Sequence, residues 1–505
     1  MSFPDKQQGS AIKPPVSAPA LNQPRRTTAF NRWPPIASPR NRDIATKMFV
    51  FGAWAALTLA ALAFVHHFGD NTPYFDEWSM VPFATGQEPV TLSWLWAQDN
   101  SHRLPLARLC LVAIYRVSEC DFRAAMYVNV FLLAGSALAL MFTARSLRGH
   151  WSAADVFFPL LLLQWAQAQN LLSGWQIQFV LSVALSCLAL IAIAKRWIYL
   201  VGCCLLLLPL CGSNGVLMVP PIACWVFYEA IRRRAFPAIS LVLGSVVICV
   251  CYMLGLQRTR LPFPGVLIAA QSAAELLGSG IGTPAHAFAT CIAMAYLVPT
   301  GLILLHWVRQ QPDRFKALVE LACIFLIGAA LVTGLLSQPS INLRWWSDCQ
   351  MVGMAALPLV LLTLRKPGFP VMLGVLLMLV VIGAARQRVE SRYVTLVFPV
   401  WAASYLAVDR LRAARLALAG ISFMVFASSV STGWNYGSRR HQAGQSFLAA
   451  VQTEGLEKAS KKASDVYWGS WDKSLLNLMK MLEKAGHPSF AKHGRESGID
   501  RAAKP

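Results

Sequence analysis

A run of acidic and aromatic residues follows the first apolar segment of the chain. It places two neighbouring carboxylates, Asp76 and Glu77, among aromatic side chains in the order Asp70-Asn71-Thr72-Pro73-Tyr74-Phe75-Asp76-Glu77-Trp78. A carboxylate that is partly removed from water becomes more basic, as a general base requires. The pattern therefore predicts a site of proton abstraction, although an acidic loop that merely faces water fits the spacing equally well.

A second polar cluster lies farther along and reads Asp99-Asn100-Ser101-His102-Arg103-Leu104-Pro105. Its first three residues are of the types that cap a helix N-terminus, which would explain them without any function. A cap needs neither His102 nor Arg103. We therefore interpret this cluster as a second candidate for binding a ligand.

Amide and indole side chains gather in two later segments. These read Gln164-Trp165-Ala166-Gln167-Ala168-Gln169-Asn170 and Gly174-Trp175-Gln176-Ile177-Gln178. Tryptophan is common at membrane interfaces, so Trp165 and Trp175 alone mean little. The amides beside them exceed what an interfacial belt needs, and surfaces of amide and indole groups are typical of sugar-binding sites.

The composition indicates the class of protein that must position these groups. Of 505 residues, 56% are hydrophobic and only 14% charged, and the mean hydropathy is +0.49, which is too apolar for a soluble globular protein. The formal net charge of +21 is explained by Lys and Arg that hold loops in the cytoplasm, so nucleic acid is not an expected partner. The sequence predicts an all-α polytopic membrane protein.

Apolar runs long enough to cross a bilayer recur along the chain. They predict about 13 transmembrane helices, and between 11 and 13 if the shorter runs are discounted. The predicted spans are 47–66, 125–144, 153–169, 177–194, 197–212, 214–230, 236–256, 286–307, 317–337, 349–364, 370–385, 393–408 and 414–432.

Most Lys and Arg residues fall in alternate loops when the N-terminus is placed in the cytoplasm, as the positive-inside rule requires. This orientation predicts a disordered cytoplasmic tail at 1–46, a transmembrane catalytic domain at 47–432 and a small helical extracytoplasmic tail at 433–505. The first outer loop is then 67–124. Within that loop we expect interfacial helices, including one at Leu104–Tyr115 that begins near Ser101 and Pro105 and lies flat on the membrane.

Arginines gather on the outer side, where membrane proteins normally avoid positive charge. A guanidinium binds phosphate through two hydrogen bonds, so a lipid-borne phosphate or pyrophosphate is the expected partner. Ion pairs with Asp348 or Glu390 are the alternative explanation. The outer arginines are Arg103, Arg258, Arg260, Arg344, Arg386, Arg388 and Arg392.

At these residues the sequence resembles the GT-C superfamily of integral-membrane glycosyltransferases, which includes the protein O-mannosyltransferases and the bacterial lipid A aminoarabinose transferases. The shared layout is an acidic motif in the first outer loop (Asp76-Glu77), surface helices after it, and an Arg-Tyr pair that opens a late helix (Ser391-Arg392-Tyr393). The resemblance covers residues 47 to about 432. The chain lacks the large outer domain of the better-known branches, so the acceptor stays open.

The chain is also similar to a bacterial branch of that superfamily with three short elements. These are Phe-Asp-Glu-Trp, His-Arg-Leu-Pro and Gly-Trp-Gln-Ile-Gln-Phe, present here as Phe75 to Trp78, His102 to Pro105 and Gly174 to Phe179. The resemblance implies a GT-C fold in a bacterial inner (plasma) membrane. It also implies transfer of a sugar from a polyprenyl-phosphate carrier to a glycan or lipid acceptor at the outer face.

Carried over by residue, the resemblance makes Asp76 the base that deprotonates the acceptor hydroxyl, with Glu77 as its rival. Arg392 would bind the carrier phosphate, helped by Arg103 or Arg344. Sugar or acceptor binding would fall to His102, Asp99, Trp165, Trp175, Gln176 and Tyr393.

Some members of the superfamily use a divalent ion, and Asp76, Glu77 and Asp99 could supply oxygen ligands for Mg²⁺ or Mn²⁺. Arginines can stabilise a phosphate leaving group without a metal, so we do not expect that a metal is required.

Two other functions remain open from the sequence. A secondary transporter would place ionisable groups near the bilayer midplane and show repeated halves, and neither feature is evident in the sequence. A ligase or polymerase of the O-antigen type would also use lipid-linked glycans but would depend mainly on arginine and histidine. His102 and Arg103 would then be central.

Overall fold

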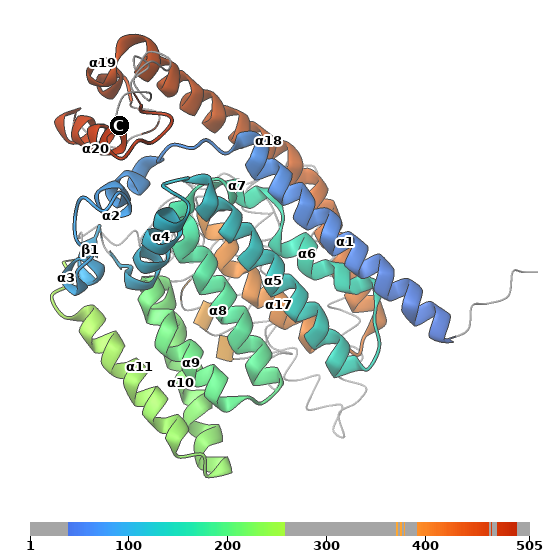
Figure 1. The fold of residues 1–505 in the computed structure, drawn as a ribbon. Helices are drawn as coiled ribbons and strands as arrows, with labels where there is room; N and C mark the ends of the chain where they lie inside the picture. Colours follow the sequence, from blue (N-terminus) through green and yellow to red (C-terminus); the bar gives the residue numbers. More distant parts are fainter. Residues whose placement is uncertain are drawn as a thin grey trace, which may run out of the picture. The chain divides into compact units, whose positions relative to one another are not determined.

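The computed structural model describes residues 39–100, 102–257, 391–463 and 472–491, with isolated positions between 370 and 378 and at 466. Within these ranges the chain is mostly helical and carries one two-stranded sheet (Figure 1). The structure therefore confirms a helical membrane protein in outline. Predicted spans 286–307, 317–337, 349–364 and nearly all of 370–385 lie outside the described residues.

Five helical stretches in the described part are long and apolar enough to cross a membrane. They overlap the predicted spans 47–66, 125–144, 177–194, 214–230 and 414–432. They are Asp43–Phe68 in α1 (Pro39–Phe68), α5 (Arg123–Arg148), Gly174–Ala194, which includes α8 (Ile177–Ala194), α10 (Ser213–Arg233) and α18 (Arg412–Glu454).

Three further predicted spans are helical but shorter or broken. The span 197–212 is α9 (Ile198–Leu207) followed by η5 (Leu208–Cys211), and 236–256 is α11 (Pro237–Met253). The span 393–408 begins as the 3₁₀ helix η6 (Ser391–Val397) and continues as α17 (Phe398–Ala407).

The predicted span 153–169 is wrong as a single helix. Where the backbone turns, amide side chains donate hydrogen bonds to backbone carbonyls that the broken helix leaves without partners. Gln164 Nε2 donates to Leu161 O at 3.2 Å, and Gln167 Nε2 donates to Leu162 O at 2.5 Å. Backbone groups away from water need such partners. The segment consists of η2 (Ala153–Val156), α6 (Phe157–Leu162), η3 (Trp165–Gln167) and α7 (Ala168–Leu171), and η4 (Gly174–Gln176) follows.

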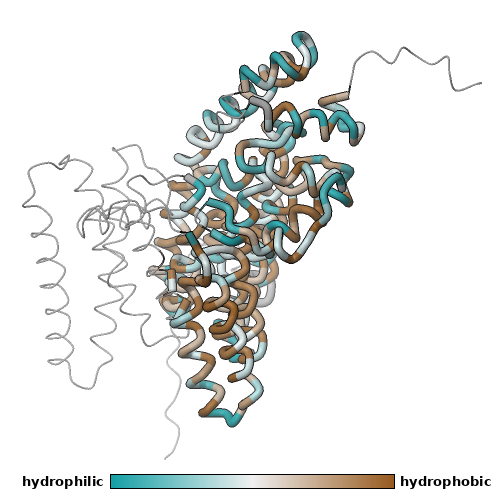
Figure 2. The backbone as a smooth tube through the Cα atoms, turned by 90° about the vertical axis from the view of Figure 1, so that its left-hand side faces the viewer, coloured by the Kyte–Doolittle hydropathy of each residue, from teal (hydrophilic) through white to brown (hydrophobic). Residues whose placement is uncertain are grey.

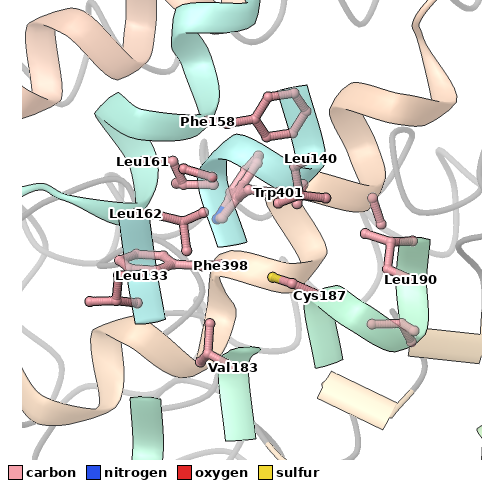
Figure 3. Close-up of a cluster of buried hydrophobic side chains, with 14 of the residues drawn as sticks. Leu133, Leu140, Phe158, Leu161, Leu162, Val183, Cys187, Leu190, Phe398 and Trp401 are labelled. Carbon is pink, nitrogen blue, oxygen red and sulfur yellow. The ribbon is translucent and has the colours of Figure 1, made fainter. Parts of the chain in front are cut away.

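The core of the helical bundle forms where α5, α6, α8 and α17 meet. Figure 3 shows Trp401 and Phe398 of α17 among leucines of the neighbouring helices, and both rings are almost fully buried. The tube in Figure 2 is mainly hydrophobic through this region. Because lipid is as apolar as leucine, such helices are held by close packing rather than by escape from water.

A buried ion cluster links the C-terminal end of α5 to the connection between α17 and α18. Arg148 lies 2.6 Å from Asp155 and 2.5 Å from Asp409, and all three side chains are buried. Tyr405 donates to the second oxygen of Asp155 at 2.9 Å. Removing one member would leave an uncompensated buried charge, so the cluster constrains how these helices end.

The loop at 67–124 and the C-terminal helices share a second hydrophobic core. The aromatic ring of Trp78 packs edge-on against Phe447 and Phe490, with ring centroids 6.1 and 5.9 Å apart. The C-terminal region is thus packed against the loop rather than a separate appendage. The elements are η1 (Phe75–Met80), α2 (Val81–Ala84), α3 (Leu92–Trp96), β1 (Gln98–Asp99), β2 (His102–Arg103), α4 (Pro105–Val117), α19 (Leu456–Lys461) and α20 (Asp472–Lys484).

The helix expected at Leu104–Tyr115 is present as α4, and Pro105 occupies its first turn. The N-cap residue is Leu104 rather than Ser101, and its side chain makes no capping hydrogen bond. The residues before it form a hairpin in which Asp99 pairs with His102. Asn100 adopts a left-handed φ of 49°, as a two-residue turn favours.

Helix α18 does not end at residue 432, where the sequence places the end of the last span. Its 43 residues extend about 65 Å, roughly twice the thickness of a bilayer core. The change at 432 is one of polarity, and the backbone continues as a helix to Glu454. In Figure 1 the helix runs beside α1, where Trp434 stacks on His67 at a centroid distance of 5.6 Å.

Close approach of α18 to its neighbours predicts a difference between two of its glycines. A Cβ at Gly433 would lie 2.7 Å from the Trp165 carbonyl oxygen, whereas a Cβ at Gly420 would meet nothing within 4 Å. Gly433→Ala should therefore cost about 1–3 kcal/mol through overpacking. Gly420→Ala should be neutral or slightly stabilising, because alanine favours helices. Thermal unfolding of the two variants in detergent measures the difference, and equal midpoints would contradict the packing.

Candidate active site around Asp76

Glu77, a residue of η1, is completely buried, and its carboxylate accepts hydrogen bonds from three parts of the chain. The backbone N–H of Tyr74 donates at 3.1 Å, and the hydroxyl of Tyr115 on α4 donates to the other oxygen. The backbone of Gly174 is a further donor. A Cβ at position 174 would overlap both the carboxylate and the tyrosine hydroxyl, so only glycine fits there.

Burial dominates the electrostatics of Glu77. It raises the pKa of this carboxyl to about 7, although the Tyr115 hydroxyl and the charge of Arg440 favour ionisation. A carboxylate enclosed in this way has no room for a substrate. The geometry favours an anchoring role for Glu77 over the role of rival base.

Asp76 is directed differently from its neighbour. Its side chain is half-buried, and burial raises its pKa, as does the nearby negative charge of Asp99, while Arg392 opposes the shift. Within the described residues no group donates a hydrogen bond to its carboxylate. Asp76 therefore combines raised basicity with an unoccupied carboxylate, as a general base needs.

Arg392 reaches this region from η6, more than 300 residues along the chain. Asn170 Nδ2 donates to the Arg392 carbonyl at 3.0 Å and also to the Thr395 hydroxyl, which donates to Gln167 Oε1 at 2.6 Å. The guanidinium lies 5.3 Å from the centre of the Tyr393 ring. The amides of η3 and α7 thus fix the turn that carries Arg392.

Most of the aromatic and amide residues expected to bind sugar are buried in the protein. Trp175 and Gln176 are each 5% exposed, and Tyr393 is 6% exposed with its ring against Phe179. Trp165 packs against Phe64 at a centroid distance of 4.6 Å. Burial favours a structural role for Trp175, Gln176 and Tyr393 over the expected contact with a sugar, whereas Trp165 is only half-buried.

Arg103 is held by backbone carbonyls. Its guanidinium donates to Trp96 O at 2.7 Å, Leu254 O at 2.9 Å and Tyr252 O at 3.2 Å. These bonds join the β1–β2 hairpin to the end of α11. The arrangement favours a structural role over the expected help with a phosphate, and Arg344 lies outside the described residues.

Asp99 and His102 face each other across the hairpin but contact different groups. Asp99 lies 3.4 Å from buried Arg108, and burial lowers the pKa of that arginine while Asp99 opposes the shift. His102 Nδ1 lies 3.3 Å from the Ser213 hydroxyl on α10. Both side chains remain partly exposed.

The three carboxylates considered as metal ligands do not converge, because Glu77 faces the interior and Asp99 pairs with Arg108. Among the described residues, no group of three or more His, Cys, Asp or Glu side chains could hold a metal ion.

A cluster that the sequence did not indicate lies beside the site. Asp70 is 4% exposed and contacts α18, with His441 Nδ1 at 2.9 Å, Gln445 Nε2 at 2.9 Å and Arg440 Nη1 at 3.8 Å. A basic pair and a glutamine in a long helix look like a solvated face. Their carboxylate partner is some 370 residues away, so spacing could not reveal it.

Glu77→Gln should remove a pH dependence from stability. The carboxyl has its raised pKa only in the folded state, so its contribution is complete below about pH 4.5 and is lost as pH rises through about 7. Over that pH range the free energy of unfolding of the wild type should fall by about 3 kcal/mol, whereas that of the variant should not. Thermal unfolding in detergent at low and neutral pH tests this, with exposed Glu88→Gln as control. Equal pH dependence in all three proteins would rule out a buried, protonatable Glu77.

No family model, curated protein or solved structure matches this chain. The activity must therefore be argued from the site itself.

Proposed function

We propose that the chain is a glycosyltransferase of the GT-C type. It moves a sugar from a polyprenyl-phosphate carrier to an envelope glycan or lipid acceptor at the outer face of a bacterial inner membrane. The observation that carries the proposal is the placement of Asp76 within electrostatic range of Arg392. The proposed base and the proposed phosphate-binding cation act on each other electrostatically there.

The proposed reaction uses the two residues in complementary ways. Asp76 accepts the proton of the acceptor hydroxyl while that oxygen attacks the anomeric carbon of the sugar. The bond from that carbon to the carrier phosphate breaks, and the phosphate leaves with the bonding electrons. Arg392 stabilises the charge that develops on the phosphate, which matters more for this leaving group than protonation does.

The arrangement of the polar segments supports the proposed topology. The first outer loop and the C-terminal helices share one hydrophobic core, so they lie on the same side of the membrane. The distribution of Lys and Arg places that side outside and the N-terminus in the cytoplasm. The carrier phosphate and Asp76 would then meet at the outer interface.

Asp76→Asn should abolish most transfer. The amide keeps the shape of the side chain but cannot accept the proton, and loss of a general base costs on the order of 10²- to 10⁴-fold in rate. Envelope glycolipids and polysaccharide from a strain that carries only this variant should lack one sugar and accumulate its lipid-linked precursor. Asp121→Asn in the same loop is the matched control, because Asp121 pairs with Arg123.

An unchanged glycan profile with Asp76→Asn would contradict the proposal. It would favour a ligase that depends on arginine and histidine, or a transporter, since neither needs this base.

Two arginine variants should fail in different ways. Arg392→Gln should lower the transfer rate while folded protein accumulates normally, because it removes charge from the leaving group. Arg103→Gln should lower the yield and the thermal midpoint, because three backbone carbonyls lose their donors. Rate per folded molecule separates the two effects. Normal transfer with Arg392→Gln would remove this arginine from the mechanism.

A further inference from the structure

The 3₁₀ helix that carries Asp76 is held by one carbonyl from the C-terminal region. Val466 O accepts the Phe75 backbone N–H at 2.9 Å and the Trp78 indole N–H at 3.3 Å. The two donors flank Asp76 on either side. Trp78 is 1% exposed, so this contact is made in the shared core and away from water.

Phe75 adopts a backbone conformation that a free chain would avoid. Its φ is 48°, in the left-handed region that costs a bulky residue free energy. Such conformations persist where surrounding contacts enforce them, and they are common at functional sites. Here the hydrogen bond to Val466 O is one such contact, made directly before the candidate base.

The register of this turn decides which carboxylate faces which environment. Glu77 is enclosed by Tyr115 and Gly174, whereas Asp76 stays half-buried, within electrostatic range of Arg392. Two acidic residues in succession could exchange these places if the turn slipped by one residue. The sequence alone contains nothing to prevent the exchange.

Arg440 of α18 makes a second set of contacts between the C-terminal region and the loop that carries Asp76. It is 4% exposed, lies 4.7 Å from the centre of the Tyr74 ring and 3.8 Å from Asp70, and its charge acts on Glu77. It therefore contacts the loop on the N-terminal side of η1. Its interactions stabilise the arrangement with Glu77 inside.

We propose that the C-terminal region is the positioning element of the active site, with Trp78 and Arg440 as positioning residues. Their contacts fix the register of η1, so that Glu77 is enclosed and Asp76 faces the carrier phosphate. This inference rests on the proposed function only in taking Asp76 as the base. The hold on η1 itself is a separate physical claim.

Trp78→Phe tests this positioning contact, because it keeps an aromatic ring in the core and deletes the indole N–H, one of the two donors to Val466 O. Amide hydrogen exchange across Phe75–Met80 should become faster, and kcat should fall on the order of 10-fold with KM changed less than about twofold. Trp434→Phe is the control, since this half-exposed indole contacts α1 instead. It should leave both measurements unchanged.

Arg440→Gln and Arg440→Lys form a second pair. Glutamine should speed exchange in η1 and lower kcat, and lysine should restore part of both because it keeps the charge. Unchanged exchange in η1 with Trp78→Phe and Arg440→Gln overturns the positioning role. So does a loss of rate that merely follows the folded fraction in thermal unfolding.

The two claims fail separately. Full transfer with Asp76→Asn refutes the proposed base, whatever the exchange experiment shows. Faster exchange in η1 with normal kcat refutes the positioning role while leaving the glycosyltransferase proposal intact.

Discussion

Enclosure of the Glu77 carboxylate is the constraint on which the candidate site depends. A buried carboxyl is costly unless its oxygens are hydrogen-bonded, and here the donors come from the residue before η1, from α4 and from the segment before α8. Satisfying this one group brings three elements to a common point and requires glycine at position 174. The adjacent residue, Asp76, is then directed outward. Burial of Glu77 thereby sets the place of Asp76, the proposed base.

The site is assembled from parts of the chain that are far apart. Asp76 comes from the first loop, Arg392 from a helix start near residue 391, and Arg440 from the polar half of α18. The loop and the C-terminal helices bury their apolar side chains against each other, which a short loop alone could not do. A continuous α18 connects this second core to the bundle, so packing in one region constrains the other.

Polar side chains in a helical membrane protein often form hydrogen bonds with backbone groups that lack a partner within their own helix. Gln164 and Gln167 take up carbonyls where helices break, and Arg103 does the same at the end of α11. An amide or guanidinium looks the same in sequence whether it binds a ligand or a carbonyl. Burial and hydrogen-bond partners distinguish the two uses. They leave Asp76 and Arg392 as the strongest candidates for chemistry.

The sequence by itself determined the class of protein, the described long spans, the helix that begins at Pro105 and the loop that carries Asp76. These follow from composition, apolar run length and local motifs, which act over a few residues. Only the tertiary structure decided that Glu77 is enclosed while Asp76 is not, that the segment 153–169 is broken, and that α18 continues to Glu454. The enclosure of Glu77, for example, depends on Tyr115 and Arg440 from elsewhere in the chain. Linear spacing cannot show which distant groups will meet, because burial and hydrogen bonding are settled by packing.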